Sequence, residues 1–381
     1  MKKIGISTVY TGFNYGSCLQ AYASQTYISK LGYDARLISY RNGLVKGRDI
    51  RIEKIFGLAC RTVVRPKLFK KTFLTYKNSL KKEMSNATKE QFLEFQDKRL
   101  KVEKLNWKQM KKFAEDRETV ACICGSDQIW NSTNVYVDPI FYLRYAPINK
   151  RIAYAPSLGK SYVPKYNEKI MKKYINGFKY ISVREKQGAE LIRDLIQKEA
   201  KVVVDPTLLL NNEEWHKSLD IKKNNEEKYI LVYFLDKPSR AAIEQIKKVT
   251  QKNKMKIYGI PYKYDEYSEL KNIEYVDAGP EKFLELISNA EEIYTDSFHG
   301  MVFSINFNKN FYIFQRNYGN AVDQSSRITS LLEKLNLSDR FISTKIIEKE
   351  IDFDKVNCYL EKEREQSKAY LDIALETVKK E

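Results

Sequence analysis

One of the two histidines in the chain, His299, follows residues that are typical of a buried β-strand. The apolar pair Ile293-Tyr294 is followed by small polar residues, then by Phe298-His299-Gly300 and an apolar run. This order predicts a strand, a tight turn and the beginning of a helix. A helix N-terminus offers unpaired N–H groups to anions, and imidazole titrates near neutral pH. The segment predicts either a histidine that acts as an acid–base catalyst beside an anion site, or a core histidine whose ring nitrogens are hydrogen-bonded within the protein.

Two glycine-bearing loops offer further polar groups after predicted strands. The loop around Asn14-Tyr15-Gly16 follows the first predicted strand, and its N–H groups can face an anion or a sugar. Its glycines can equally serve only to make the turn. The segment 125–131, Gly-Ser-Asp-Gln-Ile-Trp-Asn, follows a buried-strand pattern and brings small and polar side chains to its end. Open α/β sheets bind ligands at such strand ends.

Arg184 follows another apolar run, residues 180–183. Its planar guanidinium can hold a carboxylate or a phosphate through two parallel hydrogen bonds, or it can pair with Glu185 or a neighbouring helix. In two facing α/β units, the strand ends that carry these four clusters are expected to line one cleft. The second histidine, His216, lies beside Trp215 in a polar stretch, and we expect it to be structural or exposed.

The periodicity of the chain predicts the elements that position these residues. A strand, a loop, a helix and a strand within residues 3–40 form a βαβ pattern, without the dinucleotide fingerprint G-x-G-x-x-G. Strands and helices alternate again after the polar stretch 211–227. We therefore expect an α/β protein whose two Rossmann-like domains have parallel sheets that face each other across a cleft. The predicted parts are residues 1–208, residues 209–350 and a C-terminal helix, 351–381, that crosses back.

A basic helical insertion is predicted in the first domain, at residues 46–117. Its first part, 46–82, carries twelve basic and two acidic residues, interleaved with apolar ones. A basic amphipathic segment of this kind favours contact with an anionic membrane surface. The alternative is a solvated helical insertion with its apolar side on the core.

Composition limits the class of protein. With 381 residues and 43% hydrophobic content the chain is long enough for two or three folded domains, and its net charge of +18 predicts anionic partners. No apolar run reaches the ~18 residues of a membrane span, and the N-terminus shows no secretory pattern. The five scattered cysteines predict reduced thiols and no metal site. The aromatic residues form no known nucleic-acid reader motif, so we expect no nucleic-acid partner.

The motifs, in their order along the chain, resemble the polysaccharide pyruvyl transferase family of bacterial envelope and capsule biosynthesis. Five segments carry the resemblance: residues 14–22 (Asn-Tyr-Gly-Ser-Cys-Leu-Gln-Ala-Tyr), 125–131, 182–185 (Ser-Val-Arg-Glu), 205–207 (Asp-Pro-Thr) and 296–300 (Asp-Ser-Phe-His-Gly). The resemblance extends from about residue 3 to residue 335. No single motif is specific, but the combined order is.

The resemblance implies a GT-B-like fold and the transfer of a pyruvyl group from phosphoenolpyruvate, as co-substrate, to sugar hydroxyls. The acceptor would be a cell-surface polysaccharide, such as a capsule or exopolysaccharide, or its lipid-linked oligosaccharide precursor. The products would be a pyruvate ketal and phosphate, and no cofactor is expected. Many members carry an arginine two residues before the histidine, where this chain has Ser297. One cation expected for the donor is therefore missing from this position.

The expected site combines the resemblance with the strand ends. His299 is the expected acid–base catalyst, and Asp127 is the second catalytic candidate, as a base or as a group that accepts a sugar hydroxyl. The residues expected to bind the donor lie at strand ends and helix starts: Arg184, Ser297, Gly300, Asn14 and Gly16. The residues expected to bind the sugar acceptor are Tyr15, Ser126, Gln128 and Asn131.

Two other functions fit the same patterns. A GT-B glycosyltransferase with a nucleotide-sugar donor would release UDP and no phosphate. A non-catalytic scaffold that binds anionic lipid or glycan would bind liposomes without turning over any donor. The expected location is cytoplasmic, with peripheral binding at the inner face of the cytoplasmic membrane through residues 46–82.

Overall fold

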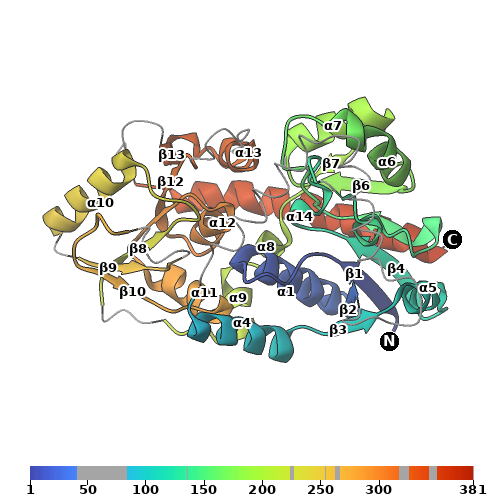
Figure 1. Cartoon of the computed structure of the whole chain (residues 1–381), viewed down its shortest axis with the longest axis horizontal. Helices are drawn as coiled ribbons and strands as arrows, with labels where there is room; N and C mark the ends of the chain where they lie inside the picture. Colours follow the sequence, from blue (N-terminus) through green and yellow to red (C-terminus); the bar gives the residue numbers. More distant parts are fainter. Residues whose placement is uncertain are drawn as a thin grey trace, which may run out of the picture.

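The structure is a computed structural model that describes residues 1–40, 84–134, 136–223, 227–253, 255–261, 267–316, 326–342 and 350–380. Two parallel β-sheets lie side by side, each covered by helices, and the last helix extends along both (Figure 1). This confirms the predicted α/β class with two Rossmann-like units and a helix that crosses back. The predicted basic segment, 46–82, lies outside the described residues.

The first sheet has the strand order β3-β2-β1-β4-β5-β6-β7 with parallel neighbours. Its strands are β1 (Lys3–Ser7), β2 (Asp34–Tyr40), β3 (Val102–Leu105), β4 (Thr119–Cys124), β5 (Arg151–Ala153), β6 (Tyr180–Val183) and β7 (Lys201–Val202). The direction of chain progression reverses between β1 and β4. Ligands bind at such a reversal, because the loops that follow the two strands diverge there.

The second sheet repeats this plan with the order β10-β9-β8-β11-β12-β13, again parallel. Its strands are β8 (Tyr229–Tyr233), β9 (Lys256–Gly259), β10 (Ile273–Tyr275), β11 (Glu292–Thr295), β12 (Asn310–Phe314) and β13 (Phe341–Ile342). Every residue of β8 is buried, as expected for a central strand with helices on both faces. The reversal lies between β8 and β11, so the His299 turn follows one of the two strands that flank it.

The helices of the first unit and the connection are α1 (Tyr15–Lys30), α4 (Asn86–Arg99), α5 (Trp107–Glu115), α6 (Lys165–Ile175), α7 (Lys186–Ile196), α8 (Pro206–Leu209) and α9 (Asn212–Leu219). Those of the second unit and the tail are α10 (Arg240–Asn253), α11 (Pro280–Asn289), α12 (Phe298–Asn306), α13 (Ser326–Lys334) and α14 (Phe353–Lys380). The predicted strand–helix alternation of both units is present in these elements.

Helix α1 connects the cores of the two units. Nearly all of its residues are buried, because it packs on β1 and β2 and also on α8, α11 and α12. Tyr15 stacks on Phe283 of α11 with ring centroids 4.3 Å apart, and its hydroxyl donates to the Ala278 carbonyl at 2.6 Å. One hydrophobic core therefore extends from the first sheet into the second and holds the two sets of strand ends together.

Helix α14 forms a second connection. The Arg364 guanidinium donates to the Leu208 carbonyl at 2.6 Å and to Asn306 Oδ1 at 2.8 Å, which links α8 to α12. Further along the helix, the Tyr370 hydroxyl donates to the Ala153 carbonyl of β5 at 2.9 Å. These bonds lie on both sides of the boundary between the units, so α14 braces it.

The predicted helical insertion, 46–117, is wrong in its last part. Residues 102–105 form β3, the edge strand of the first sheet, followed by α5. An edge strand is half exposed, so it lacks the regular alternation of apolar and polar residues that identifies a strand in a sequence. In β3 only Val102 and Leu105 are apolar, with two charged residues between them, and this pattern also fits a helix. Helix α4 packs on the second unit, where Gln91 Oε1 accepts the Gly279 N–H at 2.6 Å.

The polar stretch 211–227, after which the sequence pattern predicts a second unit, contains helix α9. Asn211 and Glu214 form a capping box at its start, and Trp215 is fully buried against Phe303 of α12. The polar residues belong to the cap and the exposed side of the helix. One buried aromatic residue was therefore too weak a signal in the sequence.

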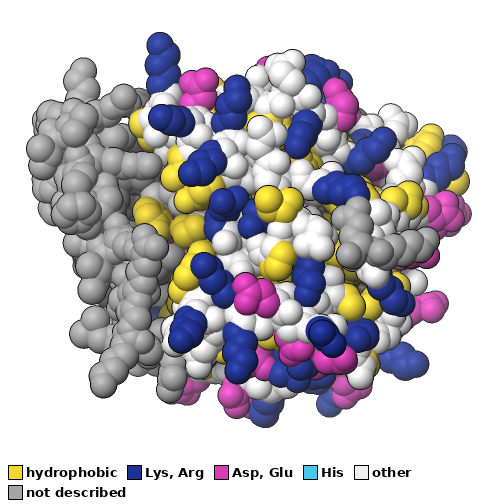
Figure 2. Space-filling view, turned by 90° about the vertical axis from the view of Figure 1, so that its right-hand side faces the viewer, with side chains coloured by type: hydrophobic (Ala, Val, Ile, Leu, Met, Phe, Trp, Pro, Cys, Tyr) yellow, Lys and Arg dark blue, Asp and Glu magenta, His cyan; other side chains and the backbone are white. Residues whose placement is uncertain are grey.

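On one face of the molecule the positive charge is dispersed. On the face in Figure 2, Lys and Arg lie among Asp, Glu and apolar side chains and do not gather into one patch. Among the described helices, none combines the length and the apolar character that a membrane crossing requires.

Candidate active site

A buried carboxylate, Asp205, joins residues from both units. It lies between β7 and α8, and its Oδ2 atom accepts hydrogen bonds from Arg184 Nη1 at 2.5 Å and from the Ser126 hydroxyl at 3.0 Å. Oδ1 accepts from the N–H of Thr207 at 3.1 Å and from its hydroxyl at 2.7 Å. His299 Nε2 lies 3.8 Å from Asp205 Oδ2, beyond hydrogen-bond distance but close enough for charge attraction.

The electrostatics of this cluster favour a charged Asp205 and Arg184. Burial raises the pKa of the Asp205 carboxyl, but the imidazole of His299, the guanidinium of Arg184 and the Thr207 N–H outweigh burial and hold it well below its usual range. Burial likewise lowers the pKa of Arg184, whereas Asp205, Asp127 and Glu185 raise it above its usual value. Asp205 and Arg184 therefore form a buried ion pair whose geometry fixes the guanidinium.

Asp127 is the most exposed carboxylate of the cluster. Its side chain is 17% exposed, compared with 0% for Asp205. Asp127 Oδ2 accepts the Ser17 hydroxyl of α1 at 2.5 Å, and Oδ1 accepts the Gln128 N–H at 2.8 Å and lies 3.9 Å from Arg184 Nη2. Asp127 can therefore contact a ligand beside Arg184 while it keeps its hydrogen bonds to Ser17 and Gln128.

The imidazole of His299 lies against the backbone of α1. His299 is in the first turn of α12 and only 8% exposed, and its Nε2 atom has no hydrogen-bond partner within the described part of the chain. A Cβ atom on Gly16 would overlap the ring, so only glycine at position 16 allows the close approach. The predicted site residues Gly16 and His299, far apart in sequence, meet directly.

With His299 as the predicted acid–base catalyst, Gly16→Ala is expected to lower kcat by about 100-fold, because a displacement of roughly 1 Å at such a group has that effect. The added methyl group pushes the imidazole away from its place beside Asp205. It is also expected to destabilise the protein by about 1–3 kcal/mol, as overpacking does. Urea unfolding and single-turnover kinetics measure the two effects separately.

The matched control is the same substitution in a His299→Ala background. Without the ring, the methyl group of Gly16→Ala has space, so most of its cost in unfolding free energy should vanish. A cost that stays the same in both backgrounds would mean that the methyl group meets something other than His299.

Four predicted donor-binding positions are explained in part by helix capping. The Asn14 side chain accepts the Ser17 N–H at 3.0 Å at the start of α1, and Ser297 accepts the Gly300 N–H at 3.3 Å at the start of α12. A cap satisfies one N–H group of the first turn and leaves others for a ligand. The structure brings Asn14, Gly16, Ser297 and Gly300 to the starts of two adjoining helices, and their contacts with a donor stay a prediction.

Two predicted acceptor-binding residues have structural roles instead. Tyr15 is 2% exposed and its hydroxyl is bound to the Ala278 carbonyl, so it holds α1 to the second unit. Ser126 is fully buried, with its hydroxyl within 2.8 Å of the Ala155 carbonyl and 3.0 Å of Asp205. Neither hydroxyl is presented to a sugar. The sequence identified the correct strand ends but not the direction of these side chains.

The other two acceptor candidates lie on the rim of the cluster. Asn131 Nδ2 donates to Gln128 Oε1 at 2.9 Å, and both residues are half-buried beside the backbone of Gly159. They flank the short 3₁₀ turn that follows Asp127. The contact of Gln128 and Asn131 with a sugar stays a prediction.

Asp205 and Ser17 were missed as site residues in the sequence. Asp205-Pro206-Thr207 carried part of the family resemblance, but no site role was predicted for it. In the structure Asp205 caps the start of α8, where its side chain accepts the Thr207 N–H. Nothing local shows that the same carboxylate meets Arg184, which is 21 residues away. Ser17 lies next to the glycine loop, but its contact with Asp127 spans 110 residues.

His216 has the structural role that the sequence predicts. Its Nδ1 lies 2.9 Å from the Asn212 carbonyl and its Nε2 lies 2.9 Å from the Ser288 hydroxyl, so the ring ties α9 to α11. The described residues contain no group of three or more His, Cys, Asp or Glu side chains arranged to hold a metal ion.

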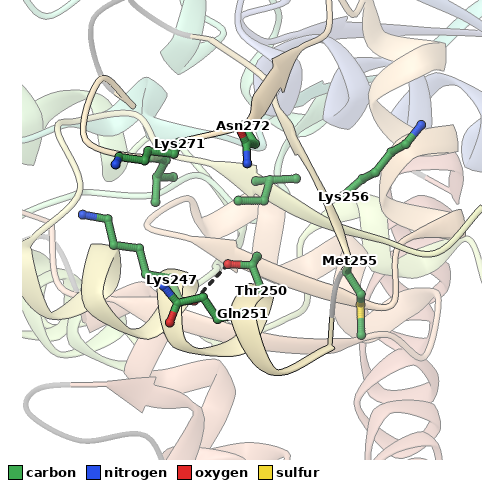
Figure 3. Close-up of a pocket in the computed structure, with 9 residues that line it drawn as sticks. Lys247, Thr250, Gln251, Met255, Lys256, Lys271 and Asn272 are labelled. Carbon is green, nitrogen blue, oxygen red and sulfur yellow. Dashed lines mark hydrogen bonds between the residues drawn. The ribbon is translucent and has the colours of Figure 1, made fainter.

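A pocket of about 640 Å³ lies in the second unit beside β9 and β10 (Figure 3). It is lined by the end of α10 and by residues at the amino ends of β9 and β10, among them Lys247, Met255 and Lys271. Figure 3 shows Lys247 and Lys271 on one side of it, with Lys256 directed away. His299 follows the carboxyl end of β11, so this pocket is not part of the Asp205 cluster.

Comparison with solved structures supports the two-unit fold. A putative UDP-N-acetylglucosamine 2-epimerase from Listeria monocytogenes superposes with a TM-score of 0.50 at 9% identity, over 100% of this chain and 91% of that chain. The UDP-GlcNAc 2-epimerase of Neisseria meningitidis gives 0.48 at 8% identity, over 98% and 94%. MurG of Acinetobacter baumannii gives 0.45 at 10% identity, over 100% and 95%. At 9% identity the likeness to the Listeria protein, with its TM-score of 0.50, shows the fold alone.

Sequence comparison identifies the family. A search of curated proteins gives no match. The profile of the family described as polysaccharide pyruvyl transferase matches residues 14–318, which include every segment that carried the resemblance. This range also contains Gly16, Asp127, Arg184, Asp205 and His299, the residues that meet at the boundary of the two units. The match covers most of the chain, and the chain belongs to the polysaccharide pyruvyl transferase family.

Proposed function

We propose that this protein transfers the pyruvyl group of phosphoenolpyruvate to two hydroxyls of a sugar in a cell-surface polysaccharide or its lipid-linked precursor. The products are a cyclic pyruvate ketal and inorganic phosphate. The observation that carries the proposal is the meeting of Arg184 and His299, from different units, around the buried Asp205. A fixed cation and a titratable imidazole side by side suit a reaction that begins by protonating an anionic donor.

Arg184 supplies the donor contact in this proposal. Its Nη1 is held by Asp205, whereas Nε and Nη2 have no hydrogen-bond partner within the described residues. Buried N–H groups are usually satisfied, because an unpaired one costs about 1–3 kcal/mol or more when charged. A carboxylate or phosphate of the donor would satisfy both at once, in the fork geometry that guanidinium favours.

The proposed chemistry starts at His299. The imidazolium donates its proton to the methylene carbon of phosphoenolpyruvate, and the electron pair of the C=C bond forms the new C–H bond. The first sugar hydroxyl attacks the resulting oxocarbenium-like C2 and loses its proton to a base. The C2–O bond to phosphate then breaks with its electron pair on phosphate. The second hydroxyl attacks C2 to close the ketal, and its proton leaves to phosphate or solvent.

Asp127 is the proposed base for the attacking hydroxyl. It is the more exposed carboxylate of the cluster and lies on the same side as Arg184 Nη2. Asp205 is unsuited to this step, because it is fully buried and its low pKa makes it a poor proton acceptor. In this proposal Asp205 holds Arg184 in place and attracts the protonated form of His299.

The test is a comparison of donors with the full-length protein and a lipid-linked or polysaccharide acceptor. With phosphoenolpyruvate we expect release of inorganic phosphate and incorporation of pyruvate into acid-labile ketals. With UDP-GlcNAc and other UDP-sugars we expect no UDP release. UDP release without phosphate release would assign a glycosyltransferase activity instead, and turnover of neither donor would favour a binding protein.

A further inference from the structure

A buried arginine of the first unit, Arg151, lacks a partner for one of its nitrogens. Arg151 is the first residue of β5 and is 5% exposed. Its Nε and Nη2 atoms both donate to the Ala146 carbonyl, at 2.9 and 2.5 Å, whereas Nη1 is buried without a hydrogen-bond partner in the described part of the chain. Because arginine is almost never fully buried unless it is paired, a partner for this guanidinium is missing.

A second guanidinium lies next to this nitrogen. Arg144 follows the 3₁₀ turn Pro139–Tyr142 and is half-buried. A Cβ atom on Gly177 would lie 2.8 Å from Arg151 Nη1 and 3.2 Å from Arg144 Nη1. Since both distances are measured from one point, the two nitrogens are at most about 6 Å apart, where two positive charges repel each other.

The described residues do not compensate these two charges with a carboxylate. Among them, none forms an ion pair with Arg144 or Arg151. Burial, and then the neighbouring Arg144, lower the pKa of Arg151 to about 10, so its surroundings disfavour its charge. The Tyr174 ring, 5.0 Å from the Arg144 guanidinium carbon, and the end of α6 attract the two cations. Both attractions are weaker than charge-assisted bonds to an anion.

Gly177 keeps the space beside the two nitrogens free of a side chain. Its φ is not in the left-handed region, so the backbone does not require glycine at this position. Gly177, Arg144 and Tyr174 are all partly exposed, and Arg151 lies behind them. The two Nη1 atoms therefore lie just beneath the surface, where an ion from solvent can come to them.

We propose that Arg144 and Arg151 bind a small oxyanion beside Gly177, and that free inorganic phosphate is the ligand. Two oxygens of one phosphate can accept from the two Nη1 atoms at charge-assisted distances of about 2.8 Å. Arg151 begins β5, whereas Arg184 follows the end of the neighbouring parallel strand β6. The two sites therefore lie at opposite edges of the sheet, and this inference does not rest on the proposed function.

The first experiment is equilibrium dialysis of the full-length protein against radiolabelled inorganic phosphate. Arg144→Met is expected to raise Kd at this site by about 10- to 100-fold, as loss of a charged hydrogen-bonding partner does. Any phosphate bound at the Asp205 cluster is retained by wild type and variant alike, so the difference between them reports on the site beside Gly177. Equal phosphate binding by wild type and a folded Arg144→Met protein overturns the inference.

Arg340→Met serves as the control for loss of an arginine that packs on a tyrosine. Arg340 is buried, its guanidinium carbon lies 5.4 Å from the Tyr312 ring centroid, and it donates to Asn310 Oδ1 at 2.9 Å. The variant should leave phosphate binding within twofold of wild type. An equal loss of phosphate binding in Arg144→Met and Arg340→Met would assign the loss to a weakened fold and contradict the site.

A second experiment supplies the anion from the chain itself, through Gly177→Asp. A Cβ atom at position 177 would meet first the ends of two flexible arginine side chains, which can shift to receive a carboxylate. In phosphate-free buffer Gly177→Asp should melt at a higher temperature than Gly177→Asn, which has the same shape without the charge. Added phosphate should raise the melting temperature of wild type more than that of Gly177→Asp, because the carboxylate already fills the site. The reverse order of melting temperatures, or equal gains from phosphate, would reject the proposal.

A final arm distinguishes free phosphate from the phosphate group of a larger molecule. Dialysis is repeated with glucose 1-phosphate in place of inorganic phosphate. Because Arg151 Nη1 is buried, inorganic phosphate should bind the site more tightly. Tighter binding of glucose 1-phosphate that is lost in Arg144→Met would overturn the assignment to a free ion.

Discussion

His299→Asn is expected to lower kcat by about 10²- to 10⁴-fold while the protein keeps its fold. Asparagine occupies similar space beside Gly16 but cannot give a proton to the methylene carbon of the donor. Because the ring lies next to Asp205 and not in its hydrogen-bond chain, the structural cost of the change is small. Single-turnover measurement of phosphate release gives the rate, and thermal unfolding checks the fold.

The chain provides its own control in the second histidine. His216 links α9 to α11 through two contacts of 2.9 Å, so His216→Asn should reduce stability and leave kcat close to wild type. If His299→Asn and His216→Asn lowered kcat to the same extent, the loss would come from a weakened scaffold. Unchanged turnover in a folded His299→Asn protein would remove His299 from the chemistry altogether.

Asp205→Asn is expected to destabilise the protein by about 3–5 kcal/mol at neutral pH, because it leaves the Arg184 charge buried without its partner. It should also abolish most donor binding, since the guanidinium loses the contact that orients it. Denaturant unfolding and titration with phosphoenolpyruvate measure the two losses.

The effect of Asp205→Asn depends on pH in a defined direction. The pKa of Asp205 is depressed in the folded protein, so its charge stabilises the fold above the ordinary carboxyl pKa of about 4. That stabilisation is lost as pH falls through the folded value. The difference in unfolding free energy between wild type and Asp205→Asn should therefore be largest near pH 7 and shrink in strong acid.

A double variant tests whether the charge pair is the cause. In an Arg184→Met background no buried cation is left unpaired, so Asp205→Asn should cost clearly less than it does alone. Additive losses, or a difference from wild type that stays constant from pH 7 to strong acid, would show that Asp205 acts through its bonds to Ser126 and Thr207 and not through its charge.

Regular elements with strong periodicity were predictable from the sequence. β8, β11 and α12 consist mainly of apolar residues between turn residues, and their burial confirms the pattern. β3, β10 and β13 were not predictable, because strands of two to four residues with exposed or charged side chains carry little periodic signal. α9 was hidden because most of its surface is polar and only Trp215 and Leu219 anchor it.

The site residues likewise fall into those that the sequence predicted correctly and those that it did not. The types of its residues and their place after strands pointed to His299, Arg184 and Asp127, because parallel strands deliver their following loops to one edge. The roles of Tyr15 and Ser126 were misjudged, because a side chain's direction depends on packing that a single sequence does not display. Tyr15 faces Phe283, and Ser126 faces Asp205.

By itself, the sequence determined the order of the strongly periodic strands and helices, the family and the turn that carries His299, since these depend on neighbours along the chain. Only the tertiary structure decided that Asp205 joins Arg184 to His299 and that Gly16 makes room for the imidazole. Each of these contacts joins residues from different elements, most of them far apart in sequence. Their distances follow from how the two sheets share one core around α1, which no local pattern encodes.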